Sequence, residues 1–135
     1  MNSLKFNYFI ANFVSILKVG IIRKLRFIKL LKLNIYLRLL RILYKQGIIR
    51  TFFVKNNKIS VYFKYYKGRN ICSKLSIVST PRNRIYWTLG KLSKNYNNYN
   101  FSGFYIISSQ KGLITTDYCL MKGHISGEVL IKVEI

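Results

Sequence analysis

The chain has 135 residues and a formal net charge of +21, from 24 Lys and Arg against three acids. Few folded enzymes carry such an imbalance, because like charges that folding brings together repel one another. A polyanion relieves that repulsion, so nucleic acid is the first candidate partner and an anionic membrane surface is the second. Half of the residues are hydrophobic, which excludes disorder through low hydrophobicity and predicts one domain, or two small subdomains that share a core.

The positive charge is concentrated in the first half of the chain. Residues 1–68 contain fifteen of the basic residues and no acid, whereas Asp117, Glu128 and Glu134 all lie in the second half. Eight basic residues fall within 18–41, and we expect this stretch to face phosphates most strongly.

A first helix is predicted over residues 6–18 from apolar residues at helical spacing, with Gly20 as its stop. Its uncharged stretch, 6–17, is shorter than the roughly 20 residues that a membrane helix needs, so we expect no membrane insertion. The segment also lacks a small-residue cleavage site and is poor in serine for a transit peptide. Residues 21–31 fit a helix or a strand equally well.

The clearest helix is predicted over residues 34–46, with Asn34 as N-cap and Gly47 after the last turn. Its basic side chains form a stripe that is either solvated or placed against phosphates or another component of an assembly. This stripe consists of Arg38, Arg41 and Lys45.

A hairpin is predicted next, with strands over 48–54 and 59–66 joined by Asn56 and Asn57, which tolerate the positive φ of a tight turn. Residues 67–70 are a break and the expected boundary between subdomains 1–68 and 69–135. The second half predicts strands over 71–79, 84–89, 104–108 and 128–133, a short helical turn over 117–122, and an Asn/Tyr-rich loop over 94–100.

Catalytic and metal-binding chemistry is poorly supplied by this sequence. His124 is the single histidine, so a hydrolase triad or a metal cluster has no partner for it, and no phosphate-binding glycine loop occurs. Cys72 and Cys119 lie far apart in the sequence and are expected to be buried free thiols. We therefore expect no enzyme, no cofactor and no small-molecule substrate.

Two segments have the residue types that contact RNA. Residues 80–87 contain two arginines, Arg82 and Arg84, and two aromatic residues, Tyr86 and Trp87. Arginine pairs with phosphate, and an exposed aromatic ring can stack on an unpaired base. We expect one of the two rings to pack in the core instead. Residues 108–112 offer hydroxyls, an amide, a cation and a glycine, although this composition by itself also fits an ordinary hairpin turn.

Four ordered segments resemble the family of small-subunit ribosomal protein eight. The strongest is Gly103-Phe-Tyr-Ile-Ile-Ser-Ser-Gln-Lys-Gly112, followed by Ile125-Ser-Gly-Glu-Val-Leu130. The others are Val78-Ser-Thr-Pro-Arg-Asn-Arg-Ile-Tyr86, Phe63-Lys-Tyr-Tyr-Lys-Gly68 and Ile42-Leu-Tyr-Lys-Gln-Gly-Ile-Ile49. Together they extend the resemblance over nearly the whole chain.

The resemblance implies an α+β fold of two packed subdomains, the first helix-strand-helix-hairpin and the second mostly antiparallel β with a short helix. It implies a structural constituent of the small ribosomal subunit that binds the central domain of the small-subunit ribosomal RNA beside neighbouring ribosomal proteins. The residues implied to bind RNA form a loop, its neighbour and their support. They are Ser108, Ser109, Lys111 and Gly112 in the loop; Thr80, Pro81, Arg84 and Tyr86 beside it; and Ser126, Gly127 and Glu128 as support. Gln110 and Arg82, which lie within the same two segments, join this set of candidate RNA-binding residues because of their residue types.

The chain also departs from the family pattern. Gln110 stands where the family usually has a third hydroxyl residue, Ser126 stands for the first of two glycines, and Leu31-Lys-Leu33 replaces the usual start of the second helix. These departures and the abundance of Ile, Lys, Asn, Tyr and Phe, which have A/T-rich codons, indicate a divergent organellar member, with the mitochondrion favoured over the plastid. A peripheral membrane protein that binds anionic lipid through basic and aromatic surfaces is the alternative interpretation.

Overall fold

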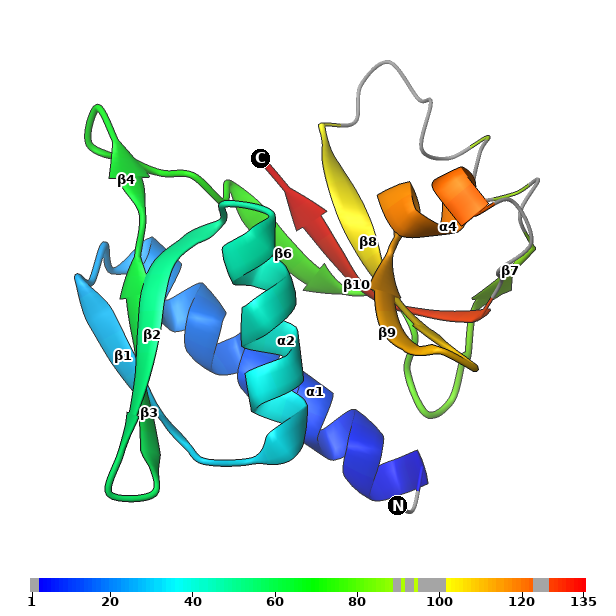
Figure 1. Cartoon of the computed structure of the whole chain (residues 1–135), viewed down its shortest axis with the longest axis horizontal. Coiled ribbons are helices and arrows are strands. Elements are labelled where there is room, and N and C mark those ends of the chain that lie inside the picture. Colours follow the sequence, from blue (N-terminus) through cyan, green and yellow to red (C-terminus); the bar gives the residue numbers. More distant parts are fainter. Residues whose placement is uncertain (1–2, 89–90, 92–93, 95–101, 123–126) are drawn as a thin grey trace.

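The structure is a computed structural model that describes residues 3–88, 91, 94, 102–122 and 127–135, with side chains for all of these except 3–7 and 120. Two α+β halves lie side by side, which confirms the expected fold class (Figure 1). The first half consists of α1 (Ser3–Ile22), β1 (Phe27–Leu31), α2 (Asn34–Lys45), β2 (Ile49–Lys55) and β3 (Lys58–Phe63). A small hairpin, β4 (Tyr65–Tyr66) and β5 (Arg69–Asn70), follows it. The second half consists of β6 (Lys74–Ile77), β7 (Tyr86–Trp87), β8 (Gly103–Ser109), β9 (Gly112–Thr115), α4 (Thr116–Lys122) and β10 (Gly127–Glu134).

Helix α1 is longer than predicted, and Gly20 lies inside it instead of ending it. A Cβ at Gly20 would lie 2.6 Å from the ring of Phe63 and 3.0 Å from a methyl group of Ile28. The glycine therefore lets the helix approach the sheet closely, which is a tertiary reason for its presence that helix-stop statistics do not capture. The ambiguous segment 21–31 divides into the end of α1 and strand β1.

Helix α2 has the predicted bounds to within one residue, but its N-cap prediction was wrong. Leu33 occupies the cap position without a side-chain hydrogen bond, and Asn34 is the first helical residue. At the other end Gly47 has φ +77, its amide donates to the Tyr44 carbonyl, and the Ile48 amide donates to the Leu43 carbonyl. These two bonds satisfy the last helical carbonyls in a Schellman motif and turn the chain into β2.

The first sheet has the strand order β1-β3-β2 and is antiparallel. The predicted turn at Asn56 and Asn57 is confirmed, with φ +52 and +60, and Ile59, Val61 and Phe63 form the buried face of β3. α1 and α2 cover one face of this sheet, and the other face points outward (Figure 1). The predicted break at 67–70 is itself the β4–β5 hairpin, whose turn residues Lys67 and Gly68 also have positive φ.

The second sheet has β10 at its centre, between β6 and β7 on one side and β8 on the other, with β9 next to β8. Strands 71–79 and 84–89 are shorter than predicted, at Lys74–Ile77 and Tyr86–Trp87, while β9 was not predicted at all. The Asn/Tyr-rich loop 94–100 and His124 lie outside the described residues, apart from Lys94.

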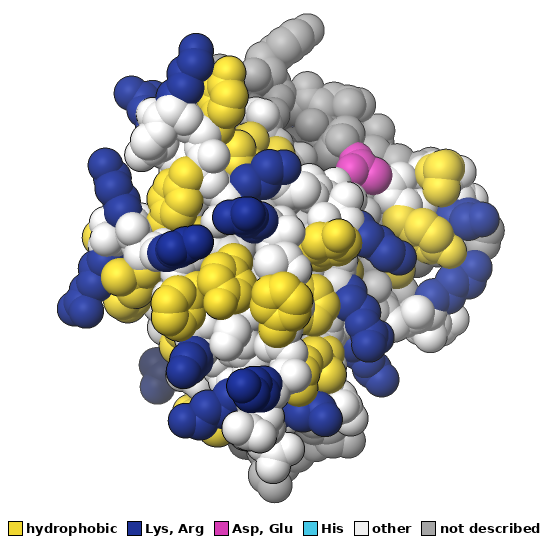
Figure 2. All heavy atoms as spheres, turned by 60° about the vertical axis from the view of Figure 1, so that its left-hand side comes forward, with side chains coloured by type: hydrophobic (Ala, Val, Ile, Leu, Met, Phe, Trp, Pro, Cys, Tyr) yellow, Lys and Arg dark blue, Asp and Glu magenta, His cyan; other side chains and the backbone are white. Residues whose placement is uncertain are grey.

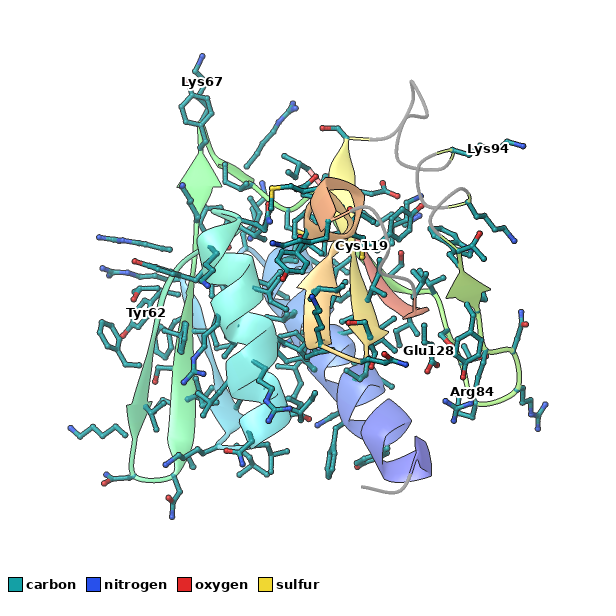
Figure 3. All side chains as sticks on the ribbon, turned by 45° about the vertical axis from the view of Figure 1, so that its right-hand side comes forward. Tyr62, Lys67, Arg84, Lys94, Cys119 and Glu128 are labelled. Carbon is teal, nitrogen blue, oxygen red and sulfur yellow. The ribbon has the colours of Figure 1, made fainter. Side chains whose placement is uncertain are left out.

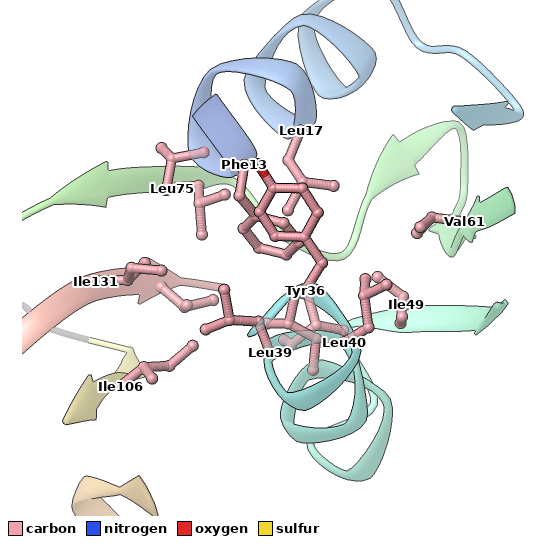
Figure 4. Close-up of a cluster of buried hydrophobic side chains, with 14 of the residues drawn as sticks. Phe13, Leu17, Tyr36, Leu39, Leu40, Ile49, Val61, Leu75, Ile106 and Ile131 are labelled. Atoms are coloured by element: carbon pink, nitrogen blue, oxygen red, sulfur yellow. The ribbon is translucent and has the colours of Figure 1, made fainter. Parts of the chain in front are cut away.

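One hydrophobic cluster joins the two halves. Phe13 and Leu39 of the first half and Ile106 and Ile131 of the second are all fully buried in it (Figure 4). Both cysteines are buried free thiols, as expected, and burial raises the pKa of Cys72 to about 11. The halves therefore hold one another in a fixed relation through apolar packing.

Candidate nucleic-acid interface

The turn between β8 and β9 is a tight one, closed by the pair Ser109 and Gly112. The Ser109 hydroxyl donates to the Gly112 carbonyl at 3.1 Å and accepts from the Lys111 amide at 3.2 Å. Gly112 has φ +97, a conformation that side chains rarely adopt, and Gln110 and Lys111 at the tip are exposed. One serine of the predicted loop is thus used to shape the turn, while the cation and the amide project into solvent.

The second predicted segment makes a turn of its own. Thr80 and Asn83 exchange two backbone hydrogen bonds of 3.1 Å, and the Asn83 amide also donates to the Thr80 hydroxyl at 3.1 Å. Pro81 and Arg82 are exposed between them. This turn presents one cation outside the β7 edge of the sheet.

Tyr86 and Trp87 are consecutive residues of β7, so their side chains point to opposite faces of the strand. Trp87 packs edge-on against Tyr105 with ring centroids 4.8 Å apart, whereas Tyr86 is 64% exposed. The expectation that one of the two rings packs in the core is confirmed. Tyr86 is left with an accessible face for stacking.

Glu128 holds the base of this region together. Its carboxylate accepts a hydrogen bond of 2.7 Å from the buried Ser79 hydroxyl and pairs with the Arg84 guanidinium at 3.3 Å (Figure 3). The Ser79 hydroxyl in turn accepts from the Ile85 amide at 3.2 Å. Arg84 is therefore tied to an internal carboxylate, which fixes the backbone that leads into β7, and it is less available to a phosphate than the sequence predicts.

The start of β10 brings the predicted segments together. Gly127 pairs with Trp87, and Glu128 pairs with Tyr86 on one side and with Ser108 on the other. Tyr86 and Ser108 therefore lie on the two sides of Glu128, although more than twenty positions separate them in sequence. Ser126, the remaining member of the predicted set, lies outside the described residues.

A groove connects the β8–β9 turn with helix α2. It has a volume of about 510 Å³ and is lined by Arg38, Arg41 and Ile42 of the helix and by residues 110–113 of the turn. Three cations face it and none of its lining residues is acidic. Such a lining favours the binding of an anionic ligand, because the three cations repel one another when the groove is empty.

Comparison with known proteins gives the family. The family model for ribosomal protein S8 matches residues 9–133. The chain belongs to the ribosomal protein S8 family.

Relatives within the family are similar over nearly their full length. The small ribosomal subunit protein uS8m of Acanthamoeba castellanii is 33% identical over 125 residues, covering 92% of this chain and 97% of the relative. The uS8 protein of Ehrlichia canis is 32% identical over 129 residues, covering 92% and 95%, and that of Helicobacter pylori strain G27 is 30% identical over 132 residues, covering 94% and 98%.

Membership of the S8 family makes the chain a structural protein of the small ribosomal subunit, and it confirms the expectation that the chain is not an enzyme. The similarities give no support to the alternative of a peripheral lipid-binding protein. In the part of the chain that the structure describes, no helix combines the length and apolar character needed to cross a bilayer.

For this S8 family member, sequence reasoning found the two turns but missed how α2 joins them. The sequence does contain a signal for this contact, since Arg38 and Arg41 belong to the basic stripe of the helix. Only the packing of α2 beside β9 places that stripe next to Lys111.

Proposed function

We propose that the chain binds the central domain of the small-subunit ribosomal RNA and supports its assembly and shape, beside neighbouring ribosomal proteins. The observation that carries this proposal is that Tyr86, from residues 80–86, and Ser108, from residues 108–112, pair with the two sides of Glu128. The binding residues are those of the two turns, and Gly127, Glu128 and Ser126 support them. The protein would position the RNA and neutralise its phosphates, without catalysing a reaction.

The arrangement of charge supports this function. The acid at the base of the site, Glu128, is largely buried and paired with Arg84, whereas Lys111 and Arg82 are exposed at the tips of their turns. A phosphate backbone that crosses the site meets cations and, at Tyr86, an exposed ring. The groove beside Arg38 and Arg41 extends the same cationic surface.

We further propose that the ribosome in question is mitochondrial. The support is the similarity to the uS8m protein, the mitochondrial form, together with the A/T-rich codon usage that the composition indicates. Cell fractionation tests it: the protein should sediment with small ribosomal subunits from mitochondria. Recovery with the ribosomes of another compartment would contradict it.

We also propose that 1–68 and 69–135 are two subdomains with a shared core, the second of which binds the RNA. The three-stranded and the five-stranded sheet are each formed within one of these ranges, which supports the division. The β4–β5 hairpin straddles the boundary and acts as the connection.

The direct test is binding of a purified central-domain RNA fragment across a salt series. Affinity should fall with a log–log slope of about 0.9 for each phosphate that is neutralised. It should exceed the affinity for an unrelated duplex of the same length at every salt concentration. A flat salt response, or equal affinity for both RNAs, would contradict the proposal.

Matched variants separate charge from shape. Lys111→Ala should lower the salt slope by about one, whereas Lys67→Ala, an exposed lysine on the β4–β5 hairpin, should leave binding of the fragment nearly unchanged. Ser108→Ala combined with Ser109→Ala should reduce the preference over unrelated duplex more than it reduces charge attraction. If the double variant keeps full selectivity, the loop is not the contact.

A further inference from the structure

The outer face of the first sheet has an aromatic cluster. Tyr62 in β3 lies between Phe27 of β1 and Phe53 of β2, at centroid distances of 5.4 and 5.9 Å. Phe27 is 43% exposed and Phe53 is 59% exposed, although burial of such large rings would stabilise the fold. In Figure 3, Tyr62 points away from the helices, on the opposite side of the molecule from Arg84 and Glu128.

Lysines follow the aromatic cluster on the same face of the sheet. The register places Lys29 opposite Ser60, in the row next to the pair Phe27 and Tyr62, and it places Lys55 opposite Lys58 at the hairpin end. Figure 2 shows hydrophobic side chains gathered in the middle of a face whose surroundings are largely Lys and Arg. No acid occurs anywhere in residues 1–68.

We propose that this face, defined by Phe27, Phe53 and Tyr62 with Lys29, Lys55 and Lys58, binds a single-stranded stretch of RNA by stacking its bases on the rings. Exposed rings on a sheet offer flat π-faces to unpaired bases, and lysines at the margin neutralise the phosphates that connect those bases. A double helix does not fit this chemistry, because its bases are already stacked on one another.

The charge of the face decides between RNA and a protein as its occupant. An apolar patch of this kind is also typical of a protein contact. A protein partner gains from the charge of this margin only where it places acids opposite the lysines, since residues 1–68 contain no acid to pair with them. A single strand supplies both the negative charge and the flat rings at regular spacing.

The experiment uses the full chain and a labelled octamer of oligouridylate, which has little structure of its own. The unmodified protein should bind it with a salt slope of about 0.7 for each contacted phosphate. Phe53→Ala and Tyr62→Ala should each weaken binding roughly tenfold with an unchanged salt slope, and Tyr62→Phe should retain affinity. Lys58→Gln should instead lower the slope.

Tyr66→Ala is the matched control, because Tyr66 is 64% exposed and lies beside a lysine but is on the β4–β5 hairpin, outside this face. It should bind the octamer like the unmodified protein. Thermal unfolding of each variant checks that the exposed-ring changes leave the fold intact. The proposal is overturned if Tyr66→Ala and Phe53→Ala lose the same amount of octamer affinity, or if Phe53→Ala loses none.

Two further measurements locate the contact. Photocrosslinking with a 4-thiouridine octamer should place adducts on the strands that carry Phe27, Phe53 or Tyr62; adducts elsewhere overturn the proposal. In native ribosomal particles, crosslinks from Lys29 or Lys58 should reach RNA, and crosslinks to a protein would instead identify a protein contact. Lys111→Ala should weaken binding of the central-domain RNA but leave octamer binding intact. The RNA-binding function at the two turns and the stacking face on the first sheet are therefore tested separately.

Discussion

Gly127 lies so close to the backbone of Ser108 that a Cβ at Gly127 would be 2.2 Å from the Ser108 carbonyl oxygen. Ser108 is the penultimate residue of β8, which leads into the β8–β9 turn, and Gly127 begins β10, which pairs with β8. The glycine is thus required by the approach of two strands, and this contact sets the position of the turn relative to Tyr86 and Trp87.

Gly127→Ala should therefore destabilise the fold by about 1–3 kcal/mol, as overpacking does in a well-packed interior, and urea denaturation measures it. It should also reduce selectivity for the central-domain RNA, because the base of the turn moves. Gly68→Ala is the control: it has a positive φ but no atom within 4 Å of the added Cβ, so it should lower stability and leave RNA selectivity unchanged. Unaltered stability of Gly127→Ala would show that the strands separate without cost.

Glu128→Ala removes the acceptor of the buried Ser79 hydroxyl and the partner of Arg84. We expect a loss of about 1–3 kcal/mol in unfolding free energy, because a buried donor is left unpaired. Glu134→Ala removes an ion pair with Lys132 at 3.1 Å whose side chains are 30% and 32% exposed, so it should cost less than about 1 kcal/mol. Equal losses from the two changes would mean that the Ser79 contact contributes nothing.

Ser109→Ala removes both hydrogen bonds that the Ser109 hydroxyl makes within the turn. The Lys111 amide should then exchange with solvent faster, because its acceptor is gone, and hydrogen exchange followed by NMR measures this. Ser109→Thr keeps a hydroxyl and should retain most of the protection. If both variants exchange at the original rate, the hydroxyl does not order the turn.

Arg38→Gln combined with Arg41→Gln should weaken binding of the central-domain RNA, since both side chains line the groove beside Lys111. Each lost phosphate contact lowers the salt slope by about 0.9, and filter binding across a salt series measures it. Arg69→Gln, which removes a charge from the β4–β5 hairpin, should change the slope little. If Arg69→Gln lowered the salt slope as much as the change of a residue in α2, the arginines of α2 would contribute only to the net charge and not to a specific contact.

The Cys72 thiol should be slow to react with thiol reagents in the folded protein and fast after unfolding, because burial raises its pKa from 9.0 to about 11. The neutral thiol is the form that the fold favours. The contribution of the Cys72 thiol to the free energy of unfolding is therefore complete below pH 9 and is lost as pH rises towards 11. Lysines and tyrosines also titrate in this range, so the measurement compares the pH dependence of unfolding with that of Cys72→Ala. Parallel curves would contradict the assignment.

Local patterns in the sequence determined the elements whose cause is local. Asn56 and Asn57 make the predicted turn, Gly47 ends α2, and alternation in β3 identifies its buried face. The excess of basic residues and four ordered motifs were enough to indicate the family and its non-enzymatic character.

Tertiary structure decided the features whose cause lies in another part of the chain. Gly20 looked like a helix stop, but contact with Phe63 explains it; Arg84 looked like a free phosphate ligand, but Glu128 pairs with it. The predicted RNA residues form one surface only because Glu128 of β10 pairs with both β7 and β8. Spacing along a chain gives the periodicity of each element, whereas strand pairing and close approach of backbones depend on residues that are distant in sequence.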